Sequence, residues 1–538
     1  MSRPPYSYAN LANPAEPFWS EQAGPPQEVT LKPYPNVPQN TLDAEILGEM
    51  HRSQIAGISA AFVKDNRVVW ANGYGWADLE KSRPVGPDTI YRIASISKTI
   101  TATALMQLWE LGLFRLDSDI SSYLGYPVRN PHYPDDKITF HMLLTHTSSI
   151  LDSGGYAAAL SSPHPPLLSE LLVPGSEAYS SLTWGDYRPG TQFNYSNFGV
   201  GIIGALVEIL SGERFEQYAI NHIFGPLGMD ASYVPADIVN YEKIAILYKT
   251  SGNSKFYPAC DYYPEGQRPA RRAYQYPLGN YYIGPAGAVR ANALDLAKFM
   301  LAHMNGGSYD GVRILRRDTV DLIQQIHWYG FGLEGLFRQM GLIFHITDTL
   351  AGRRLTGHAG EACGLVSDMY FNRGENNGII LMTNGGYYQF LRSGYTNIEE
   401  AVFNRIYAQL AGPTRPLPRV VTAVPGVSKL VVNGRQIFYP VTPDVQAGDF
   451  FIPALSLADA LKTTIEFERD TLTLSKGFNT LTALVGEPYL FINDNPIKLE
   501  SPIYTKEGYI MLPLIKVSEA FGASVSYTPA GNIIVKLA

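Results

Sequence analysis

The chain has 538 residues, of which 45% are hydrophobic and 17% charged, as in a globular protein with a large core. One domain per roughly 150 residues would give two to four domains. The net charge of −7 gives no reason to expect a nucleic acid partner. The longest strongly apolar run, residues 198–207, is far shorter than the ~18 residues that span a bilayer. We therefore expect no transmembrane segment.

Cysteines and the first residues bear on the compartment. Cys260 and Cys363 are too few for a disulfide framework or a zinc site, and the sequence leaves open whether they form a bridge or remain two free thiols. Residues 1–5 contain no apolar signal-peptide core. A cytosolic protein and one whose signal was removed both fit this start.

The elements predicted in chain order define a mixed α/β region. Residues 1–40 are rich in Pro, Tyr and Asn and predict an extended arm. Within residues 41–412, strand pairs are expected near both ends, at 58–63 with 68–71 and at 365–371 with 378–383. Helical patterns lie between them. We predict one sheet that both ends of the domain complete, with a helical part inserted in the middle.

A second domain is expected at the C-terminal end. Residues 413–428 open with a stiff, Pro-rich linker pattern. Residues 429–538 then repeat themselves at an offset of 60, as Ile452-Pro453 and Leu512-Pro513 show, and Val432-Asn433-Gly434 is echoed by Ile492-Asn493-Asp494. Self-similarity at a fixed offset predicts two copies of one unit. Each copy predicts a strand pair, a short helix after the proline and a hairpin, which together make a small α+β domain.

The first chemistry-bearing motif is Ser95-Ile96-Ser97-Lys98, at the start of a predicted helix. Free N–H groups and the helix dipole stabilise negative charge at such a position. Lys98 follows Ser95 by one turn, so its amine lies on the same face. A neutral amine there can take the serine proton. By itself the motif also fits an ordinary helix cap with a solvated lysine.

The second motif, Tyr195-Ser196-Asn197, lies at a predicted loop-to-helix junction. A tyrosine near a cationic lysine can have a lowered pKa and act as general base and acid. Asn197 can orient Lys98 and bond to a substrate amide. A packed tyrosine with an Asn cap is the structural alternative.

The third motif, His358-Ala359-Gly360, is expected just before an apolar strand near the end of the domain. Glycine lets a substrate backbone approach a strand edge closely. A backbone N–H just past Gly360 can pair with the Ser95 N–H as an oxyanion hole. A lone His such as His358 is more often structural than catalytic. His141 and His146 are interpreted as structural more firmly.

These three motifs, in this order, resemble the serine β-lactamase-like superfamily, particularly its class C-type branch of β-lactamases, D-stereospecific aminopeptidases, D,D-peptidases and carboxylesterases. The resemblance covers roughly residues 41–410. Within this range it includes, besides the three motifs, the stretches Leu143–Ser148, Gly225–Met229 and Gly284–Gly287. It implies an α/β fold with a β-lactamase/transpeptidase-like antiparallel sheet, flanked by helices and carrying an inserted helical subdomain.

The resemblance also implies roles. Ser95 would be acylated, Lys98 and Tyr195 would share proton transfer, and Asn197 would contact Lys98 and the substrate amide. The N–H groups of Ser95 and Glu361 would form the oxyanion hole.

The third box departs from the β-lactamase pattern in two ways. His358 stands where β-lactamases have a Lys, whereas D-aminopeptidase-like members carry His there. A neutral His lacks the fixed cation that grips a carboxylate. Glu361 replaces a more usual small residue and, if it faces the cleft, repels acidic ligands and attracts an amine. Ser149, where relatives often have Gly, receives no function from the sequence.

We therefore expect a D-stereospecific peptidase or amidase acting on small peptides or amides through an acyl-enzyme. The alternatives are a carboxylesterase acting on an ester, a β-lactamase, and a catalytically silent peptidoglycan-binding or signalling protein. Acyl transfer to an amine in place of water also stays open. No metal or other cofactor is expected. The stretch from Tyr257 to Tyr282, with Arg268, Arg271 and Arg272, reads as an aromatic lid, an oligomer contact or a long surface loop.

The C-terminal repeats resemble the copper amine oxidase N-terminal domain, a stalk-like module typical of secreted proteins of Gram-positive bacteria. The repeats contain no Cys and no His, so they predict no metal site. We expect residues 429–538 to associate with the cell envelope, and the protein to be extracellular or envelope-associated, although a cytoplasmic location also fits. Homo-oligomerisation is a further expectation.

Overall fold

The computed structural model describes residues 28–411, except 153, 161, 264–266, 272–273, 330–335, 338, 348–349 and 392. It also describes residues 430–536, except 433–434, 438–442, 447–448, 469, 478, 507–508 and 528–532. Most of the predicted N-terminal arm and the whole predicted linker lie outside these residues. The chain divides into two units, one of residues 1–324 and 333–414, the other of residues 325–332 and 415–538.

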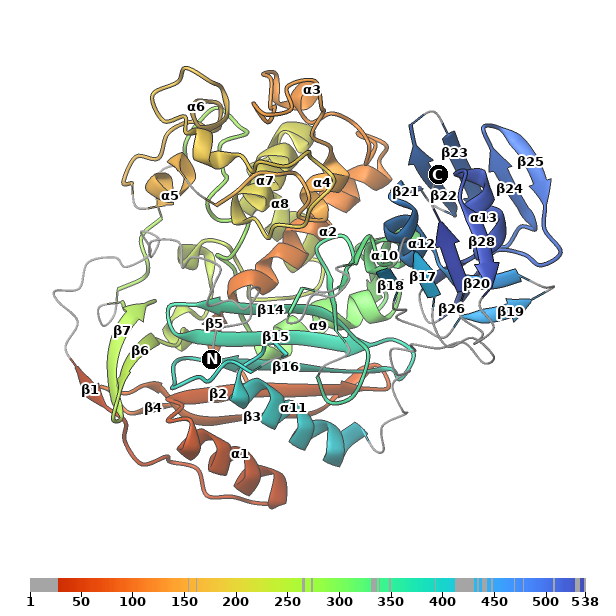
Figure 1. The fold of residues 1–538 in the computed structure, drawn as a ribbon. Coiled ribbons are helices and arrows are strands. Elements are labelled where there is room, and N and C mark those ends of the chain that lie inside the picture. The colour runs from red at the N-terminus through yellow and green to blue at the C-terminus, as the bar shows by residue number, and fades with distance from the viewer. Residues whose placement is uncertain are drawn as a thin grey trace. The chain divides into compact units, whose positions relative to one another are not determined.

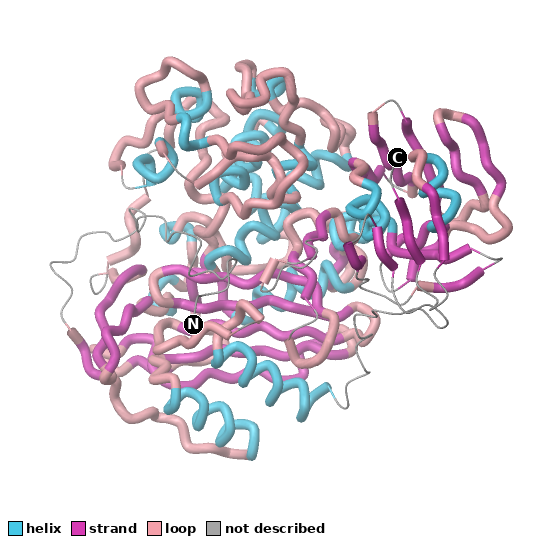
Figure 2. The backbone as a smooth tube through the Cα atoms, viewed as in Figure 1, coloured by secondary structure: helices cyan, strands magenta, loops and turns pink. Residues whose placement is uncertain are grey.

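The core of the first unit is one antiparallel sheet (Figures 1 and 2). Its strands within this unit run in the order β12-β13-β14-β15-β16-β2-β3-β4. Their bounds are Gln339–Met340, His345–Thr347, Leu355–Ala362, Leu365–Asn372, Asn377–Thr383, Gly57–Lys64, Arg67–Asp78 and Arg83–Pro84. Because β16 pairs with β2, strands from both ends of the domain complete one sheet, as the sequence predicts.

Both predicted hairpins are present in this sheet. Asp65 and Asn66 have positive φ angles of 51° and 65°, a conformation that two-residue hairpin turns require and that Asp and Asn tolerate. They join β2 to β3. The second hairpin joins β15 to β16, and the central strands of both are almost entirely buried.

Helices cover both faces of this sheet. Helices α1 (Thr41–Arg52) and α11 (Asn397–Ile406) lie along one face, and α9 (Ala293–Met304) lies along the other (Figure 1). Strands β5 (Ile90–Arg92) and β8 (Arg290–Asn292) pair over three residues, and between them in the sequence lies the inserted helical part, which contains α2 to α8. Their bounds are Ser97–Glu110, Ser121–Leu124, Phe140–Leu144, Gly155–Leu160, Leu168–Leu172, Asn197–Ser211 and Phe215–Ala219. This is the β-lactamase/transpeptidase-like fold that the sequence predicts.

Two smaller elements complete the first unit. Strands β6 (Leu247–Gly252) and β7 (Lys255–Cys260) form a hairpin, and β1 (Val29–Thr30) pairs with β7. The described part of the N-terminal arm is therefore attached to the unit by a short strand. Short strands β9 (Ser308–Tyr309) and β10 (Val312–Arg313) and helix α10 (Arg317–Gln324) follow α9.

The second unit reproduces the 60-residue repeat element by element. In the first copy, β20 (Asp449–Pro453), α12 (Ala454–Leu461) and β21 (Thr464–Glu468) follow one another. In the second copy they correspond to β27 (Tyr509–Pro513), α13 (Leu514–Ala520) and β28 (Ser524–Tyr527). Equivalent strands β20 and β27 pair antiparallel, so the two copies share one sheet. Of the echoed turn, Asn433 and Gly434 lie outside the described residues.

The remaining strands of the second unit extend this shared sheet at both edges, through β19 and β26, and complete two further sheets. They are β17 (Leu430–Val432), β18 (Arg435–Ile437), β19 (Asp444–Gln446), β22 (Thr471–Lys476), β23 (Asn479–Leu484), β24 (Tyr489–Ile492), β25 (Asn495–Lys498), β26 (Tyr504–Lys506) and β29 (Ile533–Lys536). Buried leucines from both helices and several strands form the common core, with Leu457, Leu461, Leu474, Leu481 and Leu512 at its centre.

Candidate active site

Ser95 and Lys98 lie where the backbone turns from β5 into α2. Ala94 has a φ of 45°. Residues other than glycine rarely adopt this backbone conformation, and where they do they are often at functional sites. Ser95 follows in a single 3₁₀ turn that leads directly into α2. One turn on, the Lys98 Nζ donates hydrogen bonds to Ser95 Oγ at 2.9 Å and to the Ala286 carbonyl at 2.7 Å. The structure therefore brings the predicted serine and lysine into direct contact.

The Lys98 amine is close to neutral at physiological pH. Its side chain has no solvent exposure, and burial lowers its pKa from 10.5 to about 7, because a charge is poorly solvated in the interior. The charge of Asp152 opposes this shift, and that of Arg92 adds to it. A substantial share of the molecules thus carries a free amine lone pair beside Ser95.

Tyr195 lies against the same amine, but its pKa moves in the opposite direction from the sequence expectation. The Lys98 Nζ is 4.9 Å from the centre of the Tyr195 ring. Burial raises the pKa of Tyr195 well above 10, and the Ser95 hydroxyl opposes this only in part. The charge of Asp152 raises it further, so the lowered pKa that the sequence predicts is not found. Tyr195 is a protonated phenol here.

Asp152 is the residue that sequence reasoning missed. Its carboxylate accepts from the backbone N–H groups of Asn197 at 2.9 Å and Phe198 at 2.8 Å, at the start of α7. It also accepts from the Asn197 side-chain amide at 2.6 Å. Burial raises the pKa of Asp152, whereas these donors and the Lys98 charge favour its ionised form. Asp152, which is half-buried, is thus a counter-charge to Lys98.

The position of Asp152 changes the expected partner of Asn197. The sequence expectation gave the Asn197 amide a contact with Lys98. Neither hydrogen bond of the Lys98 amine goes to Asn197, since both go to Ser95 and Ala286. Asn197 instead holds Asp152 in place, so its influence on Lys98 passes through that carboxylate.

His358 and Gly360 lie on the sheet strand β14, next to Ser95. His358 is fully buried, and its Nδ1 is 2.5 Å from the Ala359 carbonyl, which can only accept. The proton therefore lies on Nδ1, and Nε2 has no hydrogen-bond partner among the described residues. Burial, followed by the Lys98 charge, lowers the pKa of His358 well below 6.5. His358 is neutral, as the sequence predicts.

Gly360 permits a close approach between β14 and the serine turn. A Cβ added to Gly360 would lie 2.9 Å from the Ser95 backbone nitrogen and 2.8 Å from the Ile93 carbonyl, closer than real Cβ contacts. Only glycine fits there without a shift. The glycine thus keeps the Ser95 N–H beside the backbone of β14.

The next residue, Glu361, does not face the same side of the sheet as His358 and Gly360. Side chains alternate along a strand, so Glu361 and Ala359 share the opposite face. Ala359 is paired with Asp368 of β15, and Asp368 faces Glu399 of α11. Glu361 itself is exposed. The expected effect of Glu361 on ligands required its carboxylate to face the serine. The strand register places that carboxylate on the other face of the sheet.

The edge of β14 is open beside the serine. Strand β13 pairs with β14 only from Leu355 to Gly357. Among the described residues, no strand covers this edge from His358 to Ala362. Exposed backbone groups of this kind can pair with an extended ligand.

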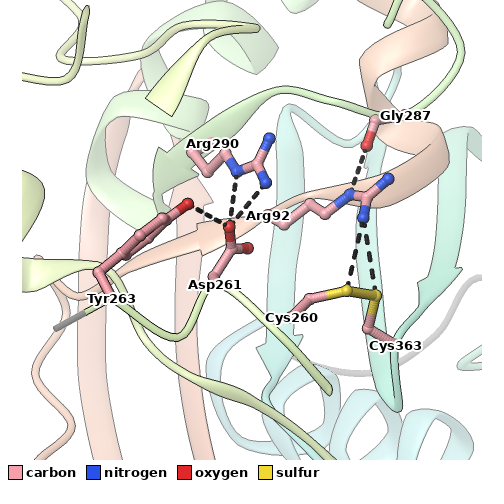
Figure 3. The surroundings of a disulfide bond; sticks show 7 residues. All are labelled: Arg92, Cys260, Asp261, Tyr263, Gly287, Arg290 and Cys363. Carbon is pink, nitrogen blue, oxygen red and sulfur yellow. Dashed lines mark hydrogen bonds and ion pairs between the residues drawn. A yellow bond between two sulfur atoms is a disulfide. The ribbon is translucent and has the colours of Figure 1, made fainter. Parts of the chain in front are cut away.

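A disulfide between Cys260 and Cys363 answers the question that the sequence left open (Figure 3). Cys363 follows β14, and Cys260 ends β7, so the bridge ties the turn after the third motif to the β6–β7 hairpin. Arg92 donates to the Gly287 carbonyl at 2.9 Å, and its guanidinium also lies against both sulfurs. The bridge and Arg92 therefore support both sides of the serine turn.

His146 and Ser149 have structural roles. The His146 Nδ1 accepts from the Ser196 N–H at 3.2 Å, and its ring packs 4.6 Å from that of Tyr195. Burial lowers its pKa to about 3, so it is a neutral acceptor. Ser149 has a φ of 63°, a left-handed conformation that favours glycine, and its hydroxyl accepts from Asn130. Glycine would adopt this conformation without strain.

The described residues hold neither a metal-binding cluster nor a membrane-spanning helix. Among the described residues, no cluster of three or more His, Cys, Asp or Glu side chains is arranged to hold a metal ion. Within the same part of the chain, no helix has both the length and the apolar character needed to cross a bilayer.

Comparison with known proteins identifies the family of the first unit and a likeness for the second. A family model described as Beta-lactamase matches residues 42–403, and the chain belongs to this family. A second model, described as Copper amine oxidase N-terminal domain, matches residues 421–535. The hydrolase family and the C-terminal resemblance that the sequence predicts are thereby confirmed.

Among curated relatives, a putative penicillin-binding protein PbpX of Bacillus subtilis is 30% identical over 253 residues, 47% of this chain and 56% of that protein. Protein flp of Staphylococcus aureus is 26% identical over 220 residues, 41% of this chain and 43% of the relative. The chain therefore spans about half the length of the curated relatives it matches.

Solved structures share the fold. An octameric penicillin-binding protein homologue from Pyrococcus abyssi has a TM-score of 0.54 at 22% identity, covering 87% of this chain and 98% of that chain. The D-amino acid amidase of Ochrobactrum anthropi SV3 has a TM-score of 0.53 at 20% identity, covering 69% and 98%. EstCE1, described as a hydrolase with promiscuous acyltransferase activity, has a TM-score of 0.52 at 19% identity, covering 68% and 98%.

Proposed function

We propose that this protein is a D-stereospecific peptidase or amidase that acts through an acyl-enzyme on Ser95. The observation that carries the proposal is the buried Lys98 amine, 2.9 Å from Ser95 Oγ and with a pKa lowered to about 7. A general base is most effective when its pKa is near the working pH. Lys98 fulfils this condition without a histidine.

In the acylation step, the Lys98 amine takes the Ser95 proton as Oγ attacks the substrate carbonyl. The carbonyl oxygen gains a negative charge and is stabilised by the N–H groups of Ser95 and Glu361, across the Gly360 contact. Tyr195, a protonated phenol, donates to the leaving nitrogen and regains a proton from the Lys98 ammonium. The leaving amine departs, and Ser95 holds the acyl group.

In the deacylation step, the same groups act in reverse. Lys98, neutral again, takes a proton from water, whose oxygen attacks the acyl carbonyl. Collapse of the intermediate returns a proton to Ser95 Oγ and releases the acid. Acceptance of the acyl group by an amine instead of water requires no change in these residues.

Substrate class is inferred from charge. Neutral His358 cannot bind a substrate carboxylate as a lysine would. Asp152 adds a negative charge near Lys98. Both features favour a neutral or amine-bearing acyl group over a dedicated β-lactam substrate. The fold likeness to the D-amino acid amidase of Ochrobactrum anthropi is consistent with this choice.

A carboxylesterase is the second candidate. A buried serine–lysine pair also attacks activated esters, and a neutral His358 suits an ester that carries no carboxylate. The fold is shared with EstCE1.

A turnover panel separates these candidates. It contains D- and L-phenylalanine p-nitroanilide, a p-nitrophenyl ester and a chromogenic cephalosporin, tested with the native protein and its Ser95→Ala variant. Ser118→Ala, in a surface turn, is the matched control. Cleavage of the D-anilide that depends on Ser95 and exceeds cleavage of the L-anilide supports the peptidase. Cleavage of the ester alone supports the esterase, and silence on all substrates supports a binding protein.

For residues 429–538 we infer an accessory role in association with the cell envelope. The support is the match of residues 421–535 to the copper amine oxidase N-terminal domain, the module that the sequence resemblance associates with secreted proteins. An extracellular or envelope-associated location follows from the same argument. We also infer that the protein forms oligomers, as the Pyrococcus abyssi homologue does. Pull-down with purified cell walls, and light scattering of the full chain, test the two inferences.

A further inference from the structure

A second concave site lies in the first unit, apart from Ser95. It is a cavity of about 550 Å³ whose described lining includes neither Ser95 nor Lys98. We call it the tyrosine cavity, because five tyrosines line it together with Glu216, namely Tyr233, Tyr263, Tyr274, Tyr281 and Tyr282. Its volume lies within the roughly 300–1,000 Å³ typical of small-molecule sites.

Glu216 gives the tyrosine cavity an unsatisfied polar group. Its side chain is only 3% exposed. One carboxylate oxygen, Oε1, contacts Arg214 at 3.0 Å and Arg271 at 3.5 Å. The other, Oε2, is buried without a hydrogen-bond partner among the described residues. A buried acceptor without a donor is unfavourable, so a ligand N–H that reaches Oε2 would be stabilising.

The charged and hydroxyl groups around this cavity are largely paired with one another. Glu208 accepts from the Tyr274 hydroxyl at 2.6 Å, and Asp261 accepts from the Tyr263 hydroxyl at 2.8 Å. The described lining holds one carboxylate, Glu216, and two guanidiniums, Arg271 and Arg290, which are paired with Asp237 and Asp261. Because both guanidiniums already hold a carboxylate, the unpartnered Glu216 Oε2 is left for a ligand N–H.

The walls of the tyrosine cavity are held in place before any ligand binds. Glu208, fully buried in α7, accepts from the backbone N–H groups of Gly279, Asn280 and Tyr281. On another wall, the buried Arg290 binds Asp261, which also holds Tyr263 (Figure 3). A preformed site loses less conformational entropy when its ligand binds.

From these observations we propose that the tyrosine cavity is a second small-molecule site, whose ligand has a flat apolar body and a positively charged nitrogen. The body packs against the tyrosine rings, which accept both apolar surfaces and cations. The nitrogen donates to Glu216 Oε2. The site is independent of the proposed acyl-enzyme chemistry.

The cavity borders elements that also hold the candidate active site. The Tyr233 hydroxyl donates to the Ser97 carbonyl of α2 at 3.0 Å. Gly284 lines the cavity, and the Ala286 carbonyl, two residues further, accepts from Lys98. A ligand in the tyrosine cavity thus touches the loop that binds the Lys98 amine.

Calorimetric titration of the full chain with phenethylamine tests the proposal. The isosteric Glu216→Gln change should weaken binding by about tenfold or more, because it removes the charge that the nitrogen meets. Ser162→Trp, which places an indole in the cavity from its lining, should abolish binding and does not depend on the stability of the Glu216 variant. Equal binding of 3-phenylpropionate or 2-phenylethanol, or no loss in Ser162→Trp, overturns the proposal.

Crystals soaked with 4-bromophenethylamine locate the ligand directly. The proposal predicts an anomalous bromine peak among the cavity tyrosines, in the native protein and in Ser95→Ala alike. A peak beside Ser95 alone, or no peak anywhere, contradicts it. The location also separates this site from the proposed function, which concerns amine-bearing substrates at Ser95.

Discussion

The charge of Asp152 sets the pH at which Lys98 becomes a base. The pKa of Lys98, about 7, reflects burial, which lowers it, and the Asp152 charge, which raises it. Asp152→Asn removes that charge and keeps the side-chain shape. An opposite charge within ~4–6 Å moves a pKa by about 1–3 units. Because Asp152 makes no hydrogen bond to Lys98, we expect the low end, about one unit, or ~1.4 kcal/mol.

The assay is the pH dependence of kcat/KM on the best substrate of the panel. Below its pKa, Lys98 is protonated and cannot accept the Ser95 proton, so the rate falls as the pH decreases. In the native protein this acid limb lies near pH 7. In Asp152→Asn, Lys98 loses its proton at lower pH, and the limb moves down to about pH 6.

Two outcomes would refute this reasoning. An acid limb that stays in place means that Asp152 does not act on Lys98 electrostatically, and one that moves upward means that the sign is wrong. Asp318→Asn, an exposed carboxylate paired with Arg316, is the control and should not move the limb. Thermal unfolding of both variants is measured separately, because Asp152 also accepts backbone N–H groups of α7.

Three further changes have defined outcomes. Gly360→Ala places a methyl group 2.9 Å from the Ser95 nitrogen and should lower kcat/KM by about 100-fold. Asp368→Asn should raise the melting temperature at about pH 8 and not at about pH 4, because burial lifts the pKa of Asp368 and folding stability therefore falls as pH rises through this range. Replacing Cys260 and Cys363 by Ser opens a loop of 103 residues and should cost about 2–4 kcal/mol in calorimetric unfolding.

For each of these three predictions, a specific result would contradict it. For the oxyanion contact, Gly374→Ala on a surface turn is the matched control, and equal activity of both variants would argue against the close approach. For Asp368→Asn, a gain in stability that does not depend on pH would mean that the change acts through packing and not through the ionisation of Asp368. For the disulfide, an unchanged melting temperature would mean that the bridge does not restrain the unfolded chain.

Local patterns made much of the fold and part of the site predictable. The two hairpins depend on short turns between apolar runs, and the repeat depends on an offset of 60 residues. Ser95 and Lys98 are one helical turn apart, so their contact follows from spacing alone. The neutral state of His358 was also predictable, because a histidine is usually neutral near pH 7.

Other features depend on tertiary structure. Asp152 lies in an irregular loop 44 residues before Ser196, and a single acidic residue there carries no pattern. The orientation of Glu361 depends on the strand register, which the sequence left as a condition. The raised pKa of Tyr195 depends on how deeply the fold buries it. Bridging of Cys260 and Cys363 requires two segments 103 residues apart to meet.

The most direct test of the central claim is intact-protein mass spectrometry after acid quenching during turnover of D-phenylalanine p-nitroanilide. The account predicts a mass increase equal to one D-phenylalanyl group, mapped to the peptide that contains Ser95 and absent from Ser95→Ala. An adduct on another residue, or an adduct that forms from the L-anilide and not from the D-anilide, would contradict it.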